Sequence, residues 1–493
     1  MFFWFFRRPA PGFHTWQTSA LRVSIATADR GDPTPSVAGH GRGSQGLAAA
    51  ALLPLLLAVA IAGCTPTDPS PVSTDEPEST DPSTARPLCI VASGDTHGWI
   101  IPCGCTSSQS GGLLRRGTYI QEQRKAADVV VVDVGGAADG TAPYQRARFR
   151  AILDGEQAMK LAVHNLGAAE VAFGPDVLRE LQQETGVRFV SANARQSDGT
   201  PIAAPWHLVS ENQSAPRLLL TGVLSPDFAT SDILVTEPAD AILGVLKNVN
   251  QDYDRLIVLA YLPIDQLRSL AETLPEADVI IGGPTGQALS PERIGQTLVL
   301  SATNKGKFLA EVTYAPGDGP PSGRIVEMSP VFPDDEQQTE NLTAFRQFLE
   351  ERDFEAGESG FADRTRLAAV GHQQIAGTES CRDCHAETHT HWAGTGHAEA
   401  WQRLLHEGAH VDPYCQQCHT TGYGLTGGFV SVRQSADRTQ TGCESCHGPS
   451  SAHVADSAVR TPFDARGICL KCHDPENSPH FEFDSYWEQV RHE

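Results

Sequence analysis

Four cysteine–histidine motifs near the carboxyl end hold the side chains best suited to chemistry. They are Cys381-Arg-Asp-Cys384-His385, Cys415-Gln-Gln-Cys418-His419, Cys443-Glu-Ser-Cys446-His447 and Cys469-Leu-Lys-Cys472-His473. In a Cys-x-x-Cys-His motif, both thiols can bond covalently to one haem while the adjacent imidazole reaches its iron. The sequence therefore predicts four covalent haem c groups, each with two cysteine attachments and one histidine ligand.

Zinc is the competing interpretation of these motifs. Paired cysteines bind structural zinc, but such a site does not require a histidine after every pair. Thiols without a cofactor would tend toward disulfides in an exported protein. The histidine that follows each of the four pairs favours haem.

The segment around the motifs has little material for a core of its own. Beyond Gly377, apolar residues are sparse and regular periodicity fades, so we expect a cofactor at its centre. Thirteen of the eighteen histidines lie at or beyond His372. A haem that transfers electrons usually takes a second protein ligand, whereas an open iron position admits a small molecule.

Residues 376–493 resemble the tetrahaem cytochrome c-554 and c-prime family. The matching segments are Trp392-Ala-Gly-Thr-Gly-His397-Ala, Cys418-His419-Thr-Thr-Gly-Tyr423-Gly and Cys446-His447-Gly-Pro-Ser-Ser-Ala-His453. The resemblance implies closely stacked haems, with His397 and His453 as distal ligands. Further ligand candidates are His480 and His492, then His410 and His372. We interpret His389, His391 and His406 as surface or packing residues.

Residues 88–333 alternate strand-like and helical patterns, which is typical of an α/β domain. The expected strands are Val129–Val134, Leu218–Gly222, Leu256–Leu262, Val279–Gly282 and Thr297–Ser301. The expected helices are Leu113–Lys125, Gln145–Leu166 and Ile264–Thr273. Within the linker, residues 334–375, Asp334 to Phe354 has the pattern of a charged connecting helix. The tail, residues 376–493, should be a small, mostly helical or irregular multihaem domain.

The α/β segment resembles the metallophosphoesterase fold of the 5′-nucleotidase family. The resembling pieces include Gly94-Asp95-Thr-His97-Gly98 and Val132-Asp133-Val-Gly135-Gly136. This resemblance implies a sandwich of mixed sheets flanked by helices, and a dimetal site of Asp, His and Asn ligands.

The match is incomplete where the family binds metal. Asp95 and His97 are retained, but Gly136 stands where a bridging Asp is expected. Gly174-Pro175-Asp176 replaces an Asn-His-Glu signature, Tyr261 a strand-end His, and Gly283-Pro284-Thr285-Gly286 a Gly-His-Ser-His run. We therefore expect no phosphoesterase activity and a docking or binding role.

A second cysteine pair lies near the start of the α/β segment, on the loop that follows its first strand. Cys103 and Cys105 are one residue apart, near Arg115 and Arg116, on the edge where α/β sites usually form. The pair could be a structural disulfide, a redox-active dithiol or a soft-metal site, or could bond Cys89. The two arginines could lie on a helix surface or bind an anion.

The amino-terminal region carries targeting features. Leu47–Ala62 has the length of a signal-peptide apolar region, and Cys64 follows as in bacterial lipoproteins, where it is lipidated. Residues 1–36 suit no export signal, and a true start near Val37 would explain them. Residues 64–87 are rich in Pro, Ser, Thr and acids, as in a disordered tether. We expect an exported, periplasmic or outer-surface lipoprotein whose residues 1–63 form the signal region.

The charge and the motifs together bound the function. A net charge of −23 argues against nucleic acid and is compatible with a basic protein partner or simply with solubility. The leading hypothesis is an electron-transfer protein with a redox partner. The alternative is an oxidoreductase acting on a small sulfur or nitrogen compound, at an open haem or at Cys103 and Cys105. An active nucleotidase is disfavoured.

Overall fold

The computed structural model describes residues 86–102, 109–210, 215–317, 319–362, 373–461 and 463–492. The predictions for residues 1–63, Cys64, Cys103, Cys105 and His372 lie outside the described residues. None of the described helices is long and apolar enough to cross a membrane.

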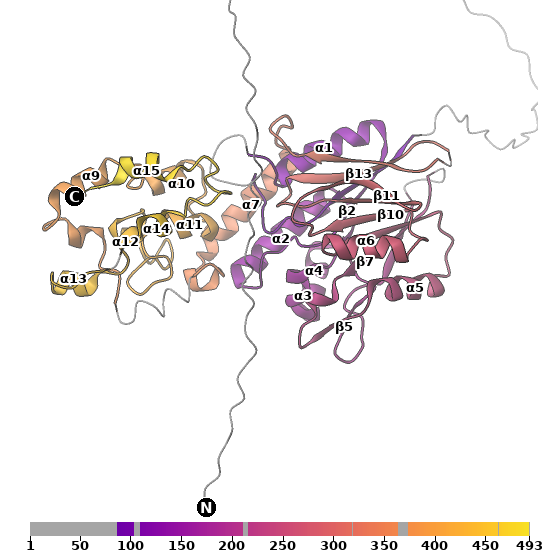
Figure 1. The fold of residues 1–493 in the computed structure, drawn as a ribbon, viewed down its shortest axis with the longest axis horizontal. Helices are drawn as coiled ribbons and strands as arrows, with labels where there is room; N and C mark the ends of the chain where they lie inside the picture. The colour runs from indigo at the N-terminus through magenta and orange to yellow at the C-terminus, as the bar shows by residue number, and fades with distance from the viewer. Residues whose placement is uncertain are drawn as a thin grey trace, which may run out of the picture. The chain divides into compact units, whose positions relative to one another are not determined.

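Two six-stranded sheets form the centre of the α/β part (Figure 1). The first has the order β14-β13-β1-β2-β3-β4 and the second β11-β12-β10-β9-β7-β6, with a small separate pair β5-β8. β1 runs parallel to β2 and antiparallel to β13, so the first sheet is mixed. β10 is parallel to β9 and β12, but β11 is antiparallel to β12, so the second is mixed too.

The strands of the first sheet are β1 (Leu88–Ser93), β2 (Asp128–Asp133), β3 (Leu161–Asn165), β4 (Phe189–Val190), β13 (Phe308–Tyr314) and β14 (Ser322–Glu327). Those of the second are β6 (Trp206–Val209), β7 (Leu218–Leu224), β9 (Arg255–Tyr261), β10 (Val279–Gly283), β11 (Leu289–Ile294) and β12 (Thr297–Ser301). The small pair is β5 (Ala194–Gln196) and β8 (Ile233–Val235). The helices of this part are α1 (Leu113–Ala126), α2 (Pro143–Ala158), α3 (Ala168–Ala172), α4 (Gly174–Thr185), η2 (Pro226–Phe228), α5 (Pro238–Asn248), α6 (Ile264–Thr273) and α7 (Glu336–Arg352).

Three apolar clusters stack these elements into four layers. Alternate residues of each strand point to opposite faces, so Ile90 and Leu259 meet between the two sheets. The outer face of the first sheet packs against α1, α2, α4 and α7. The outer face of the second packs against α5 and α6. The predicted sandwich of mixed sheets with flanking helices is confirmed.

The expected helix Gln145–Leu166 is wrong in its second half. The helix ends at Ala158, Lys160 turns the chain with φ 59°, and Leu161–Asn165 is strand β3. The apolar residues of β3 satisfy both a helical and a strand pattern, and tertiary pairing with β2 decides between them. α7 packs on α1 and α2, with Phe345 and Leu349 buried in their common core.

The tail consists of short helices and turns, as predicted. They are η4 (Thr378–Cys381), α9 (Ala386–Ala393), α10 (Ala400–His406), α11 (Pro413–His419), η5 (Ala436–Arg438), α12 (Cys443–His447), α13 (Ser451–Ala455), α14 (Ala465–Cys469) and α15 (Phe483–Val490), and η3 (Ala356–Glu358) precedes them in the linker. The apolar cluster within the tail is small, with four buried members: Trp401, Leu404, Ala409 and Phe429.

Candidate functional site

The cysteine–histidine motifs lie on or beside short helices of the tail. The second motif fills the end of α11 and the third forms α12, while the first spans the turn from η4 to α9. Residues three apart on a helix share a face, which places both thiols of a motif on one side. Attachment of both sulfurs to a single porphyrin requires this placement.

Three of the four motif histidines face a second histidine from elsewhere in the tail. The ring centroids lie 6.1 Å apart for His385 and His453, 6.2 Å for His397 and His473, and 5.8 Å for His447 and His492. An imidazole–metal bond is about 2 Å long and the ring centre lies about 1 Å behind the nitrogen, so two imidazoles on one iron have centroids roughly 6 Å apart. The three pairs have this spacing.

Several of these rings are held by one nitrogen and leave the other available. Nδ1 bonds a backbone carbonyl in His419 (Ala400 O, 2.8 Å) and in His453 (Val459 O, 2.8 Å). Because a carbonyl only accepts hydrogen bonds, Nδ1 carries the proton and Nε2 keeps its lone pair. This is the usual arrangement of metal-binding histidines.

The environment of four of the rings favours the neutral form, which iron binding requires. Burial lowers the pKa of His397, and the neighbouring His473 and His419 lower it further. Burial likewise lowers the pKa of His419 and His473. For His447, burial acts together with His492 and His385. Two neighbourhoods result, one around the first and third motifs and one around the second and fourth.

Glu444 joins the first and third motifs. Its buried carboxylate accepts hydrogen bonds from the amides of Ala376 (2.9 Å), Gly377 (2.6 Å) and Ser450 (2.8 Å). Beside these amides, the Cys381 thiol donates a hydrogen bond to Gly377 O at 3.9 Å, and it lies close enough to Cys443 to raise its own pKa and lower that of Cys443. The attachment points of two motifs therefore lie side by side.

The tail fits a large apolar cofactor. Four of its apolar side chains are 42–51% exposed: Leu405, Val454, Phe463 and Leu470. The Phe463 ring also lies near the His447 ring, with centroids 4.8 Å apart. A porphyrin bound at His447 would lie beside the Phe463 ring and cover part of it.

The other predicted ligands are placed less distinctly. His480 is exposed, and His410 is half-buried beside Trp401 with no hydrogen-bond partner for Nδ1 in the described chain. His391 was interpreted from sequence as a surface or packing residue. Its ring centroid lies 6.5 Å from that of His492. In the described part of the tail, no second imidazole ring contacts His419. The assignment of attachment residues and axial ligands remains a prediction.

Asp95 and His97 lie just after β1, at the edge of the first sheet. Both have left-handed backbone conformations, with φ 52° and 50°. Asp95 Oδ2 accepts from Thr303 Oγ1 at 2.9 Å, and burial raises the pKa of Asp95. A Cβ added at Gly136 would lie 2.5 Å from the Tyr261 ring. Tyr261 therefore occupies the space that a longer residue at 136 would need.

The interpretation of Gly174-Pro175-Asp176 needs correction. These residues begin α4, and the Asp176 side chain is 91% exposed, paired with Arg179. After β3 and Leu166 come Gly167, Ala168, Ala169 and Glu170, and the Glu170 carboxylate accepts hydrogen bonds from the amides of Ala137 and Ala138. Similar Gly-containing stretches a few residues apart made the sequence assignment ambiguous.

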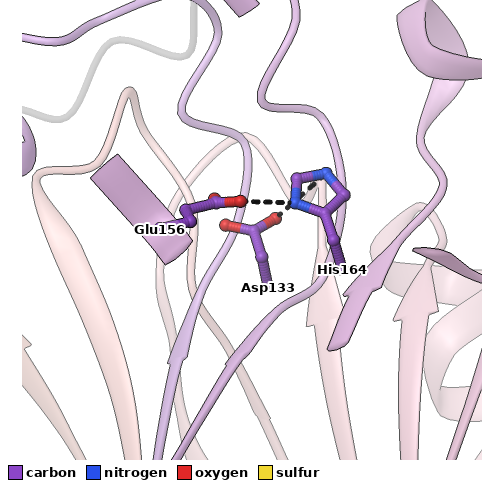
Figure 2. Close-up of side chains that lie close together, drawn as sticks. All are labelled: Asp133, Glu156 and His164. Atoms are coloured by element: carbon purple, nitrogen blue, oxygen red, sulfur yellow. Dashed lines mark hydrogen bonds and ion pairs between the residues drawn. The ribbon is translucent and has the colours of Figure 1, made fainter. Parts of the chain in front are cut away.

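A buried charge cluster lies beneath this edge and was missed in the sequence. Figure 2 shows Glu156 and Asp133 approaching the two nitrogens of the His164 ring, with Glu156 Oε2 2.8 Å from Nδ1 and Asp133 Oδ1 3.9 Å from Nε2. Glu170 Oε1 lies 3.6 Å from Nε2, and Arg116 Nη1 lies 4.0 Å from Asp133 Oδ2. The signal in the sequence was His164, which directly follows the apolar residues Leu161, Ala162 and Val163.

The cluster balances its own charge. Burial raises the pKa of Glu156 to about 7. Burial disfavours the His164 imidazolium, but Glu156 and Asp133 more than offset this and raise the pKa of His164 well above its usual range. One donor atom each from Asp133, Glu156 and His164 lie within 4.8 Å of one another, which is close enough to consider a metal ion. The adjacent buried Arg116 guanidinium would repel a dication, so an ion network is the better description.

The thiol motifs and paired imidazoles of the tail are similar to those of c-type cytochromes. Residues 380–448 match the family "Cytochrome c554 and c-prime", which implies covalently bound haem c and electron transfer. The tail is 33% identical over 88 residues to cytochrome c-554 of Nitrosomonas europaea, which covers 15% of this chain and 37% of that protein. The resemblance of the tail to this family is confirmed.

The α/β part is similar to several solved phosphoesterases. A 5′-nucleotidase precursor from Thermus thermophilus has a TM-score of 0.48 at 21% identity, over 54% of this chain and 59% of that one. The calcineurin-like phosphoesterase YfkN from Bacillus subtilis has a TM-score of 0.48 at 18% identity, over 53% and 97%. SoxB, a sulfate thiohydrolase from Thermus thermophilus, has a TM-score of 0.45 at 15% identity, over 54% and 61%.

Proposed function

We propose that this chain is an exported electron-transfer protein that carries four covalent haems in its tail. One observation carries the proposal. His385, His447 and His473 each face a second histidine, with ring centroids 5.8–6.2 Å apart. The residues that would attach the haems are the eight motif cysteines.

Electron transfer suits this arrangement of imidazoles. Iron held by a histidine on each face exchanges one electron with little change in geometry. The protein residues contribute by fixing the rings: backbone carbonyls set the tautomers of His419 and His453, and burial lowers the pKa of His419, which favours its neutral form. The adjacent first and third motifs would bring two haems close enough for rapid exchange.

Haem content tests the proposal directly. Acid–acetone extraction of the purified chain should leave the haem on the polypeptide, and the pyridine haemochrome should correspond to about four haems per chain. A Cys443→Ala, Cys446→Ala variant should lose one of them. Extractable haem, or zinc bound in its place, would refute the proposal.

The α/β part, in this proposal, is a docking or binding scaffold without phosphoesterase activity. Gly136 and Tyr261 support it, because the Tyr261 ring fills the space beside Gly136.

The excess of negative charge favours a basic redox partner. Lipidation at Cys64 would hold the protein at a membrane surface outside the cytoplasm. Cys64→Ala should release the protein from the membrane fraction.

An oxidoreductase is the second candidate function. It is favoured by His419, whose ring contacts no second imidazole in the described part of the tail. The haem at this motif would then have a face open to a small sulfur or nitrogen compound. EPR of the ferric protein should show one high-spin haem beside three low-spin haems if this is correct. Four low-spin haems would exclude it.

A further inference from the structure

A residue of the α/β part forms a hydrogen bond to the cap of α11, the helix that carries the second haem motif. Tyr144, fully buried in α2, donates a hydrogen bond to Asp412 Oδ1 at 2.6 Å. The same oxygen accepts from the amide of Tyr414 at 2.9 Å and so caps the first turn of α11. Three residues after Asp412 comes Cys415, the first attachment site of this motif.

Arg148 completes the contact from the next turn of α2. Its guanidinium donates to the Tyr144 hydroxyl at 3.2 Å and pairs with Asp139. It also lies over the Tyr414 ring, 5.2 Å from the centroid. Arg148 is only 6% exposed, so its charge acts on α11 with little screening by water.

The loops at the carboxyl edge of the first sheet touch the same region. Trp99, two residues after His97, packs edge-on against Tyr414 with centroids 5.1 Å apart. Lys305 pairs with Glu476, just beyond the fourth haem motif. Asn477 Nδ2 donates to the Tyr414 hydroxyl at 3.2 Å. The edge where a phosphoesterase would hold its metals therefore contacts Tyr414, directly before the second motif, and Glu476, three residues after the fourth.

We infer that the α/β part positions the second haem: Tyr144 and Arg148 hold Asp412, the cap of α11, and thereby set the orientation and the reduction potential of the haem at Cys415, Cys418 and His419. This inference rests on the proposed function, because it needs a haem at that motif. Tyr144, Arg148 and Asp412 are positioning residues.

The charges of Asp412 and Arg148 predict the direction in which each substitution shifts the reduction potential of the haem. Reduction adds one negative charge, so a nearby carboxylate lowers the potential of a haem and a nearby guanidinium raises it. Asp412→Asn keeps the cap, since Asn caps helices as well as Asp does, but removes the charge. The potential of one haem should rise. Arg148→Gln should lower the potential of the same haem.

The experiment is a potentiometric titration of the full haem-loaded chain, followed by absorbance and EPR. Tyr144→Phe changes no charge, and in combination with Asp412→Asn it should give a shift that is not the sum of the two single shifts. Tyr314→Phe is the matched control, because this tyrosine is also buried but its hydroxyl has no hydrogen-bond partner in the described chain. Its four potentials should equal those of the parent.

A merely structural contact would give a different result. Loss of packing alone would broaden the redox transitions of several haems or reduce haem content. It would not shift the potential of one haem in opposite directions for Asp412→Asn and Arg148→Gln. If Arg148→Gln does not fold, Asp412→Asn alone carries the sign test. Four haems with unchanged potentials in Asp412→Asn and Tyr144→Phe would overturn this inference and leave the proposed function standing. Absence of covalent haem would overturn the proposed function itself.

Discussion

Glu444 should be the most sensitive acidic side chain of the tail. Its carboxylate accepts three backbone hydrogen bonds, from Ala376, Gly377 and Ser450, and is 1% exposed. Hydrogen bonds to a charged group contribute about 1.5–3 kcal/mol each. Glu444→Ala should therefore lower the free energy of unfolding of the tail by about 4 kcal/mol or more, and Glu444→Gln by roughly half as much.

Denaturant unfolding followed by haem absorbance measures this change. Glu407→Ala is the control, because its side chain is 73% exposed and, among the described residues, pairs only with His406; its effect should stay below about 0.5 kcal/mol. The Glu444 variants should also perturb the spectra of the first and third haems, whose attachment sites Glu444 joins. Equal unfolding curves for Glu444→Ala and Glu407→Ala would refute the reasoning.

Three further predictions concern the iron ligands, the α/β edge and pH. His453→Ala and His397→Ala should each convert one haem from low spin to high spin in EPR, and unchanged spectra in both would show that these histidines are not ligands. Added manganese or zinc should elicit no nucleotide hydrolysis, and turnover abolished by Asp95→Ala would contradict this. Burial raises the pKa of Glu156 from 4.5 to about 7 on folding. The folded state thus binds this proton more tightly, and the resulting stability, roughly 3 kcal/mol, is complete below about pH 4.5 and lost as the pH rises through about 7. Urea titrations at about pH 5 and about pH 8 should show this loss, and Glu156→Gln should reduce the difference.

The sequence was most informative where a pattern is local. The expected strands Val279–Gly282 and Thr297–Ser301 and the helix Ile264–Thr273 agree with the structure to within a residue, because burial and periodicity act over a few neighbours. The helix drawn through residues 145–166 failed because strand β3 is defined by pairing with β2, which no local pattern records.

The candidate site divides in the same way. The attachment motifs are contiguous and can be found by inspection, but for the three motif histidines that face a second histidine, the partner is not the next histidine along the chain. His453 lies six residues after His447 yet faces His385, and His397 faces His473 across 76 residues. The charge cluster of Glu156 and His164 was hidden for a related reason, since the two residues acquire their meaning only when the fold brings them together.

Tyr261 constrains how this chain can change. The added Cβ at Gly136 would lie 2.5 Å from its ring, and Gly136 itself has φ 78°, which disfavours any other residue. An aspartate at 136 therefore requires a second substitution at 261, and Tyr261 belongs to the buried core of the first sheet. Any mutational path toward a carboxylate at this position must first pass through a destabilised intermediate. This dependence between the two positions favours the retention of both Gly136 and Tyr261.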